Sequence, residues 1–382
     1  MVHLNHLIKH KLLLAFLAGS SLFTTSSNAG VIQFFNLPND LNQSLKTELN
    51  LFIANDPVSI DAFLHKWHGK YTPNDSKNLA MLDSRVDIGG FINDYYVGYF
   101  YQYNVFIDTN RDFTDLFYNI KNKNDLISGR DYNLNLDIKG IRQHGLMLAK
   151  SVDIYKDKSS EIRFLGGFYL SYAKHMQEGF IKGSARTNSP KDYDIDASSS
   201  YYYTHNYLYK LDTDASHGFG YGMHLGLTYE DRKNSWGLKF LVNDFLSSVL
   251  WKDLPYSKIS ILTKNKTYDD QGYTQYSPTI NGLEKYKDYT QKLDTSYKLE
   301  ATKKIDNFHL RGGIDSKYSD FFPYVNLGYV FDDSKLLEVS YESRFGSFGV
   351  GYHSEYFNIN LSADDFTDVS AFGLSSSFIF RF

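Results

Sequence analysis

Apolar and polar residues alternate along most of this chain, and this period of two constrains the fold more than any other feature. Between Tyr95 and Asp108, every second residue from Tyr95 to Ile107 is aromatic or aliphatic, whereas Gln102 and Asn104 lie between them. Successive side chains of a β-strand point to opposite faces. The pattern recurs up to the C-terminus and predicts strands with one apolar and one hydrated face.

The aromatic content shows where the apolar faces lie. The chain has 32 Tyr and 29 Phe but only 7 Pro, and its mean hydropathy is -0.40. A soluble β-sandwich would fill its core mainly with Val, Ile and Leu, whereas lipid-facing strands with aromatic girdles account for this bias. After the first 29 residues, no stretch approaches the ~20 apolar residues of a membrane helix. The sequence therefore predicts an all-β protein, a closed antiparallel transmembrane β-barrel.

The expected barrel has about 16 strands, within a range of about 12 to 16. Closure removes the exposed edges that an open sheet of this size would carry. Segments 132–141 and 145–155 are expected as separate strands, as are 236–247 and 256–267. The long connections are expected at 109–130, 175–199 and 268–291. Sixteen strands would place the first of these at the periplasmic end, opposite the other two, unless a strand near the start has been missed.

The N-terminal region divides the chain into three parts. Residues 1–29 resemble a signal peptide, with Lys9 and Lys11 before an apolar run and Ala29 at the cleavage site. Residues 30–83 are expected to be a helical segment, either a plug or a periplasmic element, and residues 84–382 the barrel. Leu41, Leu45 and Leu49 fit one helical face, and a second helix is expected from Asp56 to Gly69.

Composition also excludes several classes of protein. The chain has no Cys, so it has no disulfide framework, thiol nucleophile or Cys-ligated zinc. Its formal net charge of -4 argues against nucleic acid as a partner.

The last strand carries a specific motif. In "FGLSSSFIFRF", aromatic side chains recur at every second position up to the end, at Phe378, Phe380 and Phe382. This resembles the C-terminal strand of bacterial outer-membrane β-barrel proteins, a porin-like family feature. The resemblance implies that these three residues are an insertion signal for the barrel assembly machinery, that outer-membrane lipid surrounds the barrel, and that the protein resides in the cell outer membrane of a Gram-negative envelope.

The hydrated faces of the strands are expected to line the lumen. They carry charges of both signs, so the sequence predicts a wet interior and weak ion selectivity. The expected lumen-lining residues are Asn133, Asn135, Asp137, Lys139, Arg163, Lys239, Asp294, Lys298, Glu300, Arg311, Glu338 and Glu342.

The function expected from these features is an outer-membrane channel for the passive passage of small hydrophilic solutes. One alternative is a non-conducting structural or surface-interaction barrel whose long Tyr-rich loops bind a polysaccharide or a periplasmic or surface partner. A hydrolase at the barrel rim ranks last, because His353, Ser354 and Glu355 are adjacent and would point to different faces. No enzyme activity, cofactor, metal site or catalytic residue is predicted.

Overall fold

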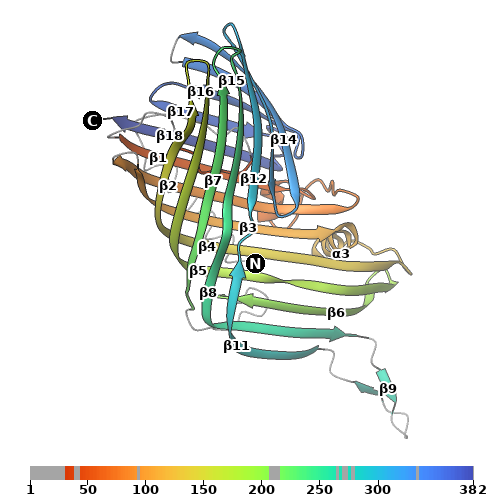
Figure 1. Ribbon diagram of the computed structural model, residues 1–382. Coiled ribbons are helices and arrows are strands. Elements are labelled where there is room, and N and C mark those ends of the chain that lie inside the picture. The colour runs from red at the N-terminus through yellow and green to blue at the C-terminus, as the bar shows by residue number, and fades with distance from the viewer. Residues whose placement is uncertain are drawn as a thin grey trace.

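The computed structural model describes residues 31–37, 44–92, 95–205, 216–263, 266–268, 274–276, 280–332 and 335–381. Residues 1–29, expected to be a signal peptide, and Phe382 lie outside the described residues. Figure 1 shows a single curved wall of strands that encloses an interior, with helix α3 beside the ends of β3 and β4.

The described residues form a large sheet, a small hairpin and two short helices. The first half of the sheet contains β1 (Ser44–Asn55), β2 (Lys77–Ile92), β3 (Tyr95–Asn110), β4 (Asp131–Lys156), β5 (Ser160–Ser189), β6 (Asp192–Tyr203), β7 (Gly218–Asp231) and β8 (Trp236–Leu262). The second half contains β11 (Ile280–Lys292), β12 (Ser296–Ile305), β13 (Phe308–Lys317), β14 (Asp320–Asp332), β15 (Lys335–Glu342), β16 (Ser347–His353), β17 (Phe357–Ala363) and β18 (Ala371–Arg381). The hairpin is β9 (Lys266–Tyr268) with β10 (Thr274–Tyr276), and the helices are α2 (Ile60–Leu64) and α3 (Arg111–Asn122).

Antiparallel pairing closes the sheet into a barrel. The first and last strands pair over their length, from Ser44 opposite Arg381 to Ala54 opposite Ala371. Around the ring the order is β8, β12 to β18, β1 to β5, β7 and back to β8. These 14 strands form the closed barrel, and β6 and β11 make 16 in the whole sheet. The predicted fold class, a closed antiparallel barrel within the expected range of strands, is therefore confirmed.

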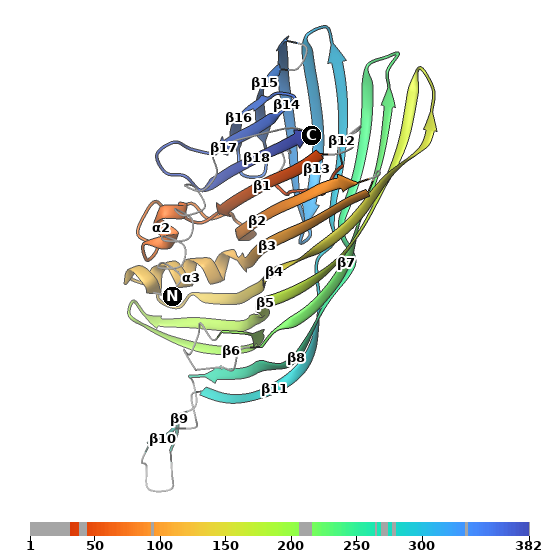
Figure 2. The same ribbon diagram turned by 90° about the vertical axis from the view of Figure 1, so that its left-hand side faces the viewer.

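The two additional strands continue strands of the ring. The strands β6 and β7 pair with successive parts of β5, and β11 and β12 with successive parts of β8. Asp244 and Leu246 of β8 have φ values of 55° and 49°, near the place where the pairing of β8 passes from β12 to β11. Figure 2 shows β4, β5, β6, β8 and β11 extending together past the rest of the wall.

The structure corrects the prediction for the N-terminal region. Residues 44–55 are strand β1 and not a helix, so this segment belongs to the barrel. Leu45, Leu49 and Ile53 fit a helical face, but with Leu51 they also form the outward face of a strand. Lys46 and Glu48 are buried on the inward face of the strand. In a helix they would have flanked the apolar face. The pairing of β1 with β2 and β18 decides between the two readings.

The expected connections are also partly wrong. Residues 175–199 are not a loop, because β5 and β6 pair from Gln177 opposite Tyr203 to Ser189 opposite Asp192. The expected strands 132–141 and 145–155 are the single strand β4, and most of 236–247 and 256–267 belongs to β8. With β1 added, the connection between β3 and β4 lies at the same end of the barrel as the one between β8 and β11. The long connections therefore share one end.

Two connections at this end pack on each other. Asn110 caps α3 by accepting a hydrogen bond from the backbone N–H of Phe113, at 3.1 Å. The rings of Tyr71 and Tyr118 stack at 4.0 Å, joining the connection after β1 to α3. The helix predicted from Asp56 to Gly69 is only the five residues of α2, because Lys66 and Trp67 have φ values of 67°.

The outer surface of the barrel is apolar and aromatic. On β14, for example, Phe321, Val325, Leu327, Tyr329 and Phe331 are exposed, whereas the residues between them are mostly buried. The predicted two-faced strands are thus present, with the apolar face outward. Within the described residues, no helix is long and apolar enough to cross a membrane.

This outward face predicts a cost for a charge in contact with lipid. Val325 lies near the middle of β14 and is 48% exposed. The variant Val325→Arg is expected to lower the free energy of unfolding in lipid vesicles by about 2–4 kcal/mol, because the guanidinium must be accommodated in hydrocarbon. Urea unfolding measures this, with Val325→Leu as the control. A loss of stability equal to that of the control would contradict the lipid-facing assignment.

From the contacts of Asp115 on α3, we expect the stability of the packed connections to depend on pH. Burial raises the pKa of the Asp115 carboxyl, but hydrogen bonds from Tyr71, Arg130 and Arg111 outweigh it, so the pKa lies below its ordinary value. A lowered pKa stabilises the fold above the ordinary value, and this stabilisation is lost as the pH falls through the lowered pKa.

The hydrogen-exchange protection factors of peptides from 60–72 and 111–122, which correct for the intrinsic effect of pH, should therefore fall below about pH 4, the ordinary range of an Asp carboxyl. Asp115→Asn should have lower protection factors at neutral pH and lose most of this pH response. An unchanged response in that variant would show that other carboxyl groups control these connections.

Candidate channel lumen

Residues 31–37, here called the lumen segment, lie inside the barrel. Val31, Ile32 and Phe34 pack with a cluster that includes Ala54 and Ala371, at the end of the barrel that carries the long connections. Phe35 and Leu37 pack with a second cluster at the other end; it includes Phe91, Tyr96, Phe100, Tyr169 and Ile379. The segment therefore runs along the barrel axis and fills the interior between the two clusters.

Polar contacts fix the lumen segment to the wall. The Gln33 amide donates to the carboxylate of Asp87 on β2 at 3.2 Å, and the backbone N–H of Phe35 donates to the Asn243 side chain of β8 at 3.2 Å. Asn243 donates in return to the carbonyl of Gln33 at 2.8 Å. Lys46 of β1 donates to the carbonyl of Asn36 at 3.1 Å. These bonds pair several polar groups of the segment in a buried site, although the Gln33 side-chain oxygen has no partner among the described residues.

One side of the wall is a network of paired charges. On β12, Lys298 pairs with Asp315 of β13 at 2.8 Å, and Glu300 accepts hydrogen bonds from Lys239 at 3.0 Å and from Tyr324 at 2.8 Å. The Lys298 ammonium also lies 5.2 Å from the centre of the Phe34 ring. The network therefore holds the lumen segment as well as neighbouring strands.

A second network lies on the strands that follow. The Nε and Nη2 atoms of Arg311 on β13 donate hydrogen bonds to Glu338 of β15, and Asn326 of β14 donates to the same carboxylate at 3.3 Å. His353 of β16 lies 3.6 Å from it. The opposite charges of these buried groups pair with one another, because burying a charge without a partner raises the free energy of the fold.

An ion pair crosses the interior. Lys317 of β13 donates to Asp83 of β2 at 2.7 Å, and both side chains are almost fully buried. These strands lie on opposite sides of the ring, seven strand positions apart in either direction. This ion pair therefore links opposite sides of the wall.

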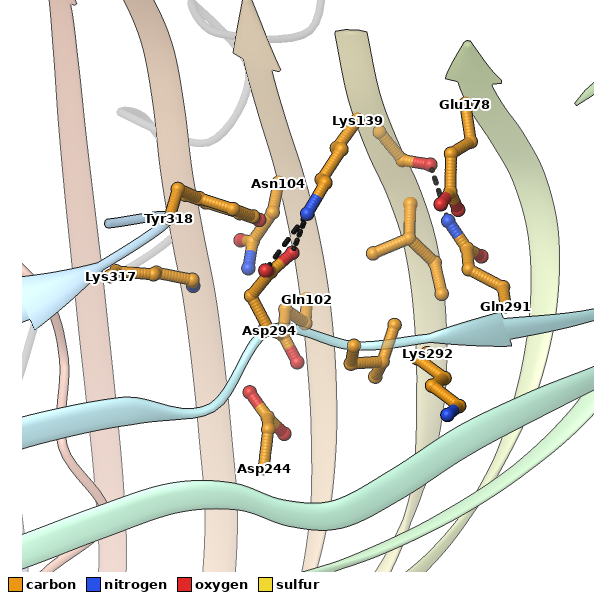
Figure 3. A pocket seen from close by; sticks show the side chains of 13 residues that line it. Gln102, Asn104, Lys139, Glu178, Asp244, Gln291, Lys292, Asp294, Lys317 and Tyr318 are labelled. Atoms are coloured by element: carbon orange, nitrogen blue, oxygen red, sulfur yellow. Dashed lines mark hydrogen bonds and ion pairs between the residues drawn. The ribbon is translucent and has the colours of Figure 1, made fainter. Parts of the chain in front are cut away.

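A small polar pocket lies beside this bridge. Figure 3 shows Lys317 and Asp244 pointing toward it and Lys139 reaching Asp294, whose oxygens accept its hydrogen bonds at 2.7 and 2.8 Å. The pocket has a volume of about 20 Å³, which is room for about one water molecule. The described side chains are therefore closely packed around this pocket.

The structure places the predicted lumen residues in three groups. Inside the barrel, mostly paired as above, are Lys139, Lys239, Asp294, Lys298, Glu300, Arg311, Glu338 and Glu342. Arg163 lies at the opposite end from the long connections, where it pairs with Asp153 and Glu161. Asn133, Asn135 and Asp137 lie where β4 extends past most of the wall, and Asn133 is exposed.

The predicted insertion signal lies on the last strand. The side chains of Phe378 and Phe380 alternate with the buried Ile379, so both belong to the outward face of β18. Phe382 lies outside the described residues.

Sequence reasoning missed several interior residues. Lys46 and Asp83 lie in the segment 30–83 that was predicted to be helical, whereas Arg85 and Asp87 lie in the predicted barrel but were not among its predicted lumen residues. The lumen segment was not distinguished from the rest of residues 30–83. The sequence contained a signal for strands here, because inward and outward residue types alternate with a period of two in "SLKTEL" and "LDSRVD". Which charges pair across the barrel has no such local signal.

The adjacent residues 353–355 do not form a catalytic arrangement. The His353 ring approaches Glu338, the Ser354 hydroxyl donates to the carbonyl of Phe357, and Glu355 pairs with Arg381. Among the described residues, no group of three or more His, Cys, Asp or Glu side chains is placed to hold a metal ion.

Comparisons with known proteins give no family assignment. No family model matches the chain, and no curated protein matches it. Among solved structures, a TodX deletion mutant, described as a monoaromatic hydrocarbon channel, is 10% identical, with 90% of this chain and 91% of that chain covered and a TM-score of 0.45. The toluene transporter TodX of Pseudomonas putida is 12% identical, with 91% of both chains covered and a TM-score of 0.42. The outer-membrane protease OmpT of Escherichia coli is 9% identical, with 88% and 94% covered and a TM-score of 0.21.

These values are too low to carry an argument about function. The class of the protein rests on its own strand pairing and surface: a closed antiparallel barrel with an apolar, aromatic exterior and a polar interior. These are the features of an outer-membrane β-barrel protein. The resemblance of the last strand to that class is in agreement with the fold.

The bridge across the barrel predicts a coupling between two distant residues. Lys317→Met should lower the free energy of unfolding by about 3–5 kcal/mol, because it leaves the buried carboxylate of Asp83 without a partner. The double variant Lys317→Met with Asp83→Leu should recover most of this loss. Urea unfolding of the two single variants and the double variant measures the coupling, and additive losses would contradict a direct ion pair.

Proposed function

We propose that this protein is an outer-membrane channel for small hydrophilic solutes and that the lumen segment holds it closed. The observation that carries the proposal is the position of residues 31–37 along the axis of a barrel whose inner wall is otherwise mostly polar. A barrel of this strand number has more room inside than an eight-stranded one, which its own side chains can fill. Removal of seven residues from its interior would provide a water-filled path.

The contacts of the lumen segment support a role as a gate. Its polar contacts include individual hydrogen bonds with Asp87, Asn243, Lys46 and Asp315, together with the approach of Lys298 to Phe34. Such contacts can be exchanged for water when the segment moves. The wall, in contrast, is held by continuous backbone ladders. Opening would therefore leave the barrel intact.

Location and assembly belong to the same proposal. The chain would be exported by residues 1–29, folded by the barrel assembly machinery through the last strand and inserted in the outer membrane. The packed connections around α2 and α3 would lie on the cell surface, opposite the short turns such as Ile305–Phe308.

A second candidate is a channel for apolar solutes. Its support is the aromatic surface that Phe35 covers, where the rings of Tyr96 and His224 each lie 5.4 Å from its own ring. Movement of the segment would expose this surface to the path. Uptake of toluene compared with uptake of a pentose by the same proteoliposomes distinguishes the two candidates.

A non-conducting surface barrel is a further alternative. Under this reading, the connections around α2 and α3 would bind a surface polysaccharide or a protein partner. Replacement of residues 60–72 by a Gly/Ser linker would then abolish binding and leave conductance unchanged.

Deletion of residues 31–37 tests the gate. In planar bilayers the intact protein is expected to show little conductance, and the deletion variant a stable open conductance, because the axial path is no longer filled. A Gly/Ser segment of equal length is the matched control, and it should give an intermediate conductance. Folding is checked by strand content and resistance to detergent. A folded deletion variant that does not conduct would contradict the channel.

A further inference from the structure

Two regions of the inner wall differ in character. The region formed by β8 and β12 to β15 carries most of the paired charges described above. Between β16 and β18, the inward positions are small and uncharged over most of their length. They are Ser347, Gly349, Gly351, Asn358, Asn360, Ser362, Gly373, Ser375 and Ser377. This surface is called here the small-residue wall.

The small-residue wall leaves space beside the lumen segment. A pocket of about 30 Å³ lies between Val31 and this wall and is lined by Asn50, Ser347, Ser362 and Ser375, among others. A side chain at some of the inward glycines would force a neighbouring side chain to move. An added Cβ would lie 1.9 Å from the Asn360 amide oxygen at Gly351. Larger side chains would fill the space that the wall leaves open.

Two buried polar atoms in this pocket have no hydrogen-bond partner among the described residues. They are the amide nitrogen of Asn50 on β1, a residue 4% exposed, and the hydroxyl of Ser347, a residue 2% exposed. A buried donor of this kind costs free energy unless a ligand or water satisfies it. The pocket is therefore equipped to bind a molecule that both donates and accepts hydrogen bonds.

The hydrogen-bonded side of the lumen segment faces strands outside the small-residue wall. The hydrogen bonds of Gln33 and Phe35 go to β2 and β8, and Lys298 of β12 approaches Phe34. None of the described ion pairs within β8 and β12 to β15 involves the lumen segment, so a displacement away from the small-residue wall would keep them intact. Breaking those pairs would leave buried charges unsatisfied.

We propose that solute passes between the lumen segment and the small-residue wall, and that this wall selects small neutral solutes rich in hydroxyl groups, such as polyols. The inference rests on the proposed function and names its path and substrate class. Ser and Asn side chains exchange hydrogen bonds with hydroxyl groups at little cost. Among the described residues, Glu342 is the one charged side chain that lines the pocket, and its carboxylate accepts hydrogen bonds from the backbone N–H groups of Arg344 and Phe345. These neutral donors leave its negative charge in place, so an anion entering the path is repelled and a neutral solute is not.

Cysteine labelling tests the path, because the natural chain has no Cys. The test variant is Ser375→Cys. Its matched control is Ser171→Cys, an inward position on β5 whose hydroxyl donates to Gln143 at 2.8 Å and which lies away from the wall. Proteoliposomes carrying each variant are treated with a neutral methanethiosulfonate reagent. Mass spectrometry measures labelling, and influx of ribitol and of its carboxylate analogue ribonate measures transport.

The expected result is labelling of Ser375→Cys, with ribitol influx reduced at least about fivefold by the added group in the path. Ser171→Cys should keep its influx, and untreated protein should admit ribitol faster than ribonate. Influx that is insensitive to labelling at Ser375, or equally sensitive at Ser171, would overturn the path. Equal influx of ribitol and ribonate would overturn the substrate class. Absence of influx both in the intact protein and in the variant lacking residues 31–37 would instead overturn the proposed function.

Discussion

The pairing of β1 with β18 is the constraint on which the rest of the structure depends. In hydrocarbon, a backbone N–H or C=O group without a partner costs several kcal/mol, so a sheet can cross a membrane only when it closes. Here the register from Ser44 opposite Arg381 to Ala54 opposite Ala371 removes the last two edges. The same register places Lys46 and Glu48 inside and Leu45 outside. Closure therefore determines both what the lipid contacts and what the interior must accommodate.

The interior accommodates its charges by pairing them. Lys298 with Asp315, Lys317 with Asp83 and Arg311 with Glu338 each join different strands. Such pairs contribute less to stability than their Coulomb attraction suggests, because both charges are removed from water. Their effect is geometric, because they hold strands of the wall at fixed distances. The lumen segment contacts Lys298 of the charged region and borders the pocket beside the small-residue wall.

Much of the fold could be predicted from the sequence because its main signal is local. The outward faces of β3, β12 and β14 follow from reading every second residue, and lipid selects aromatic and aliphatic side chains there. The ends of β4 and β8 were harder to predict from the sequence, because polar residues within these strands resemble the residues of turns. The segment from Ser44 to Asn55 was misread because its leucines satisfy a helical period as well as a strand period. Only pairing with both neighbouring strands removes that ambiguity.

The sequence by itself determined that the chain is a two-faced β-barrel and which side chains of most strands share a face, because a period of two is a property of neighbouring residues. The tertiary structure alone decided that the ring has 14 strands, that residues 31–37 occupy its axis, and which charges meet. Lys317 and Asp83 are 234 residues apart and face each other only after closure. No local pattern encodes such a contact, because it depends on the circumference and register of the whole ring.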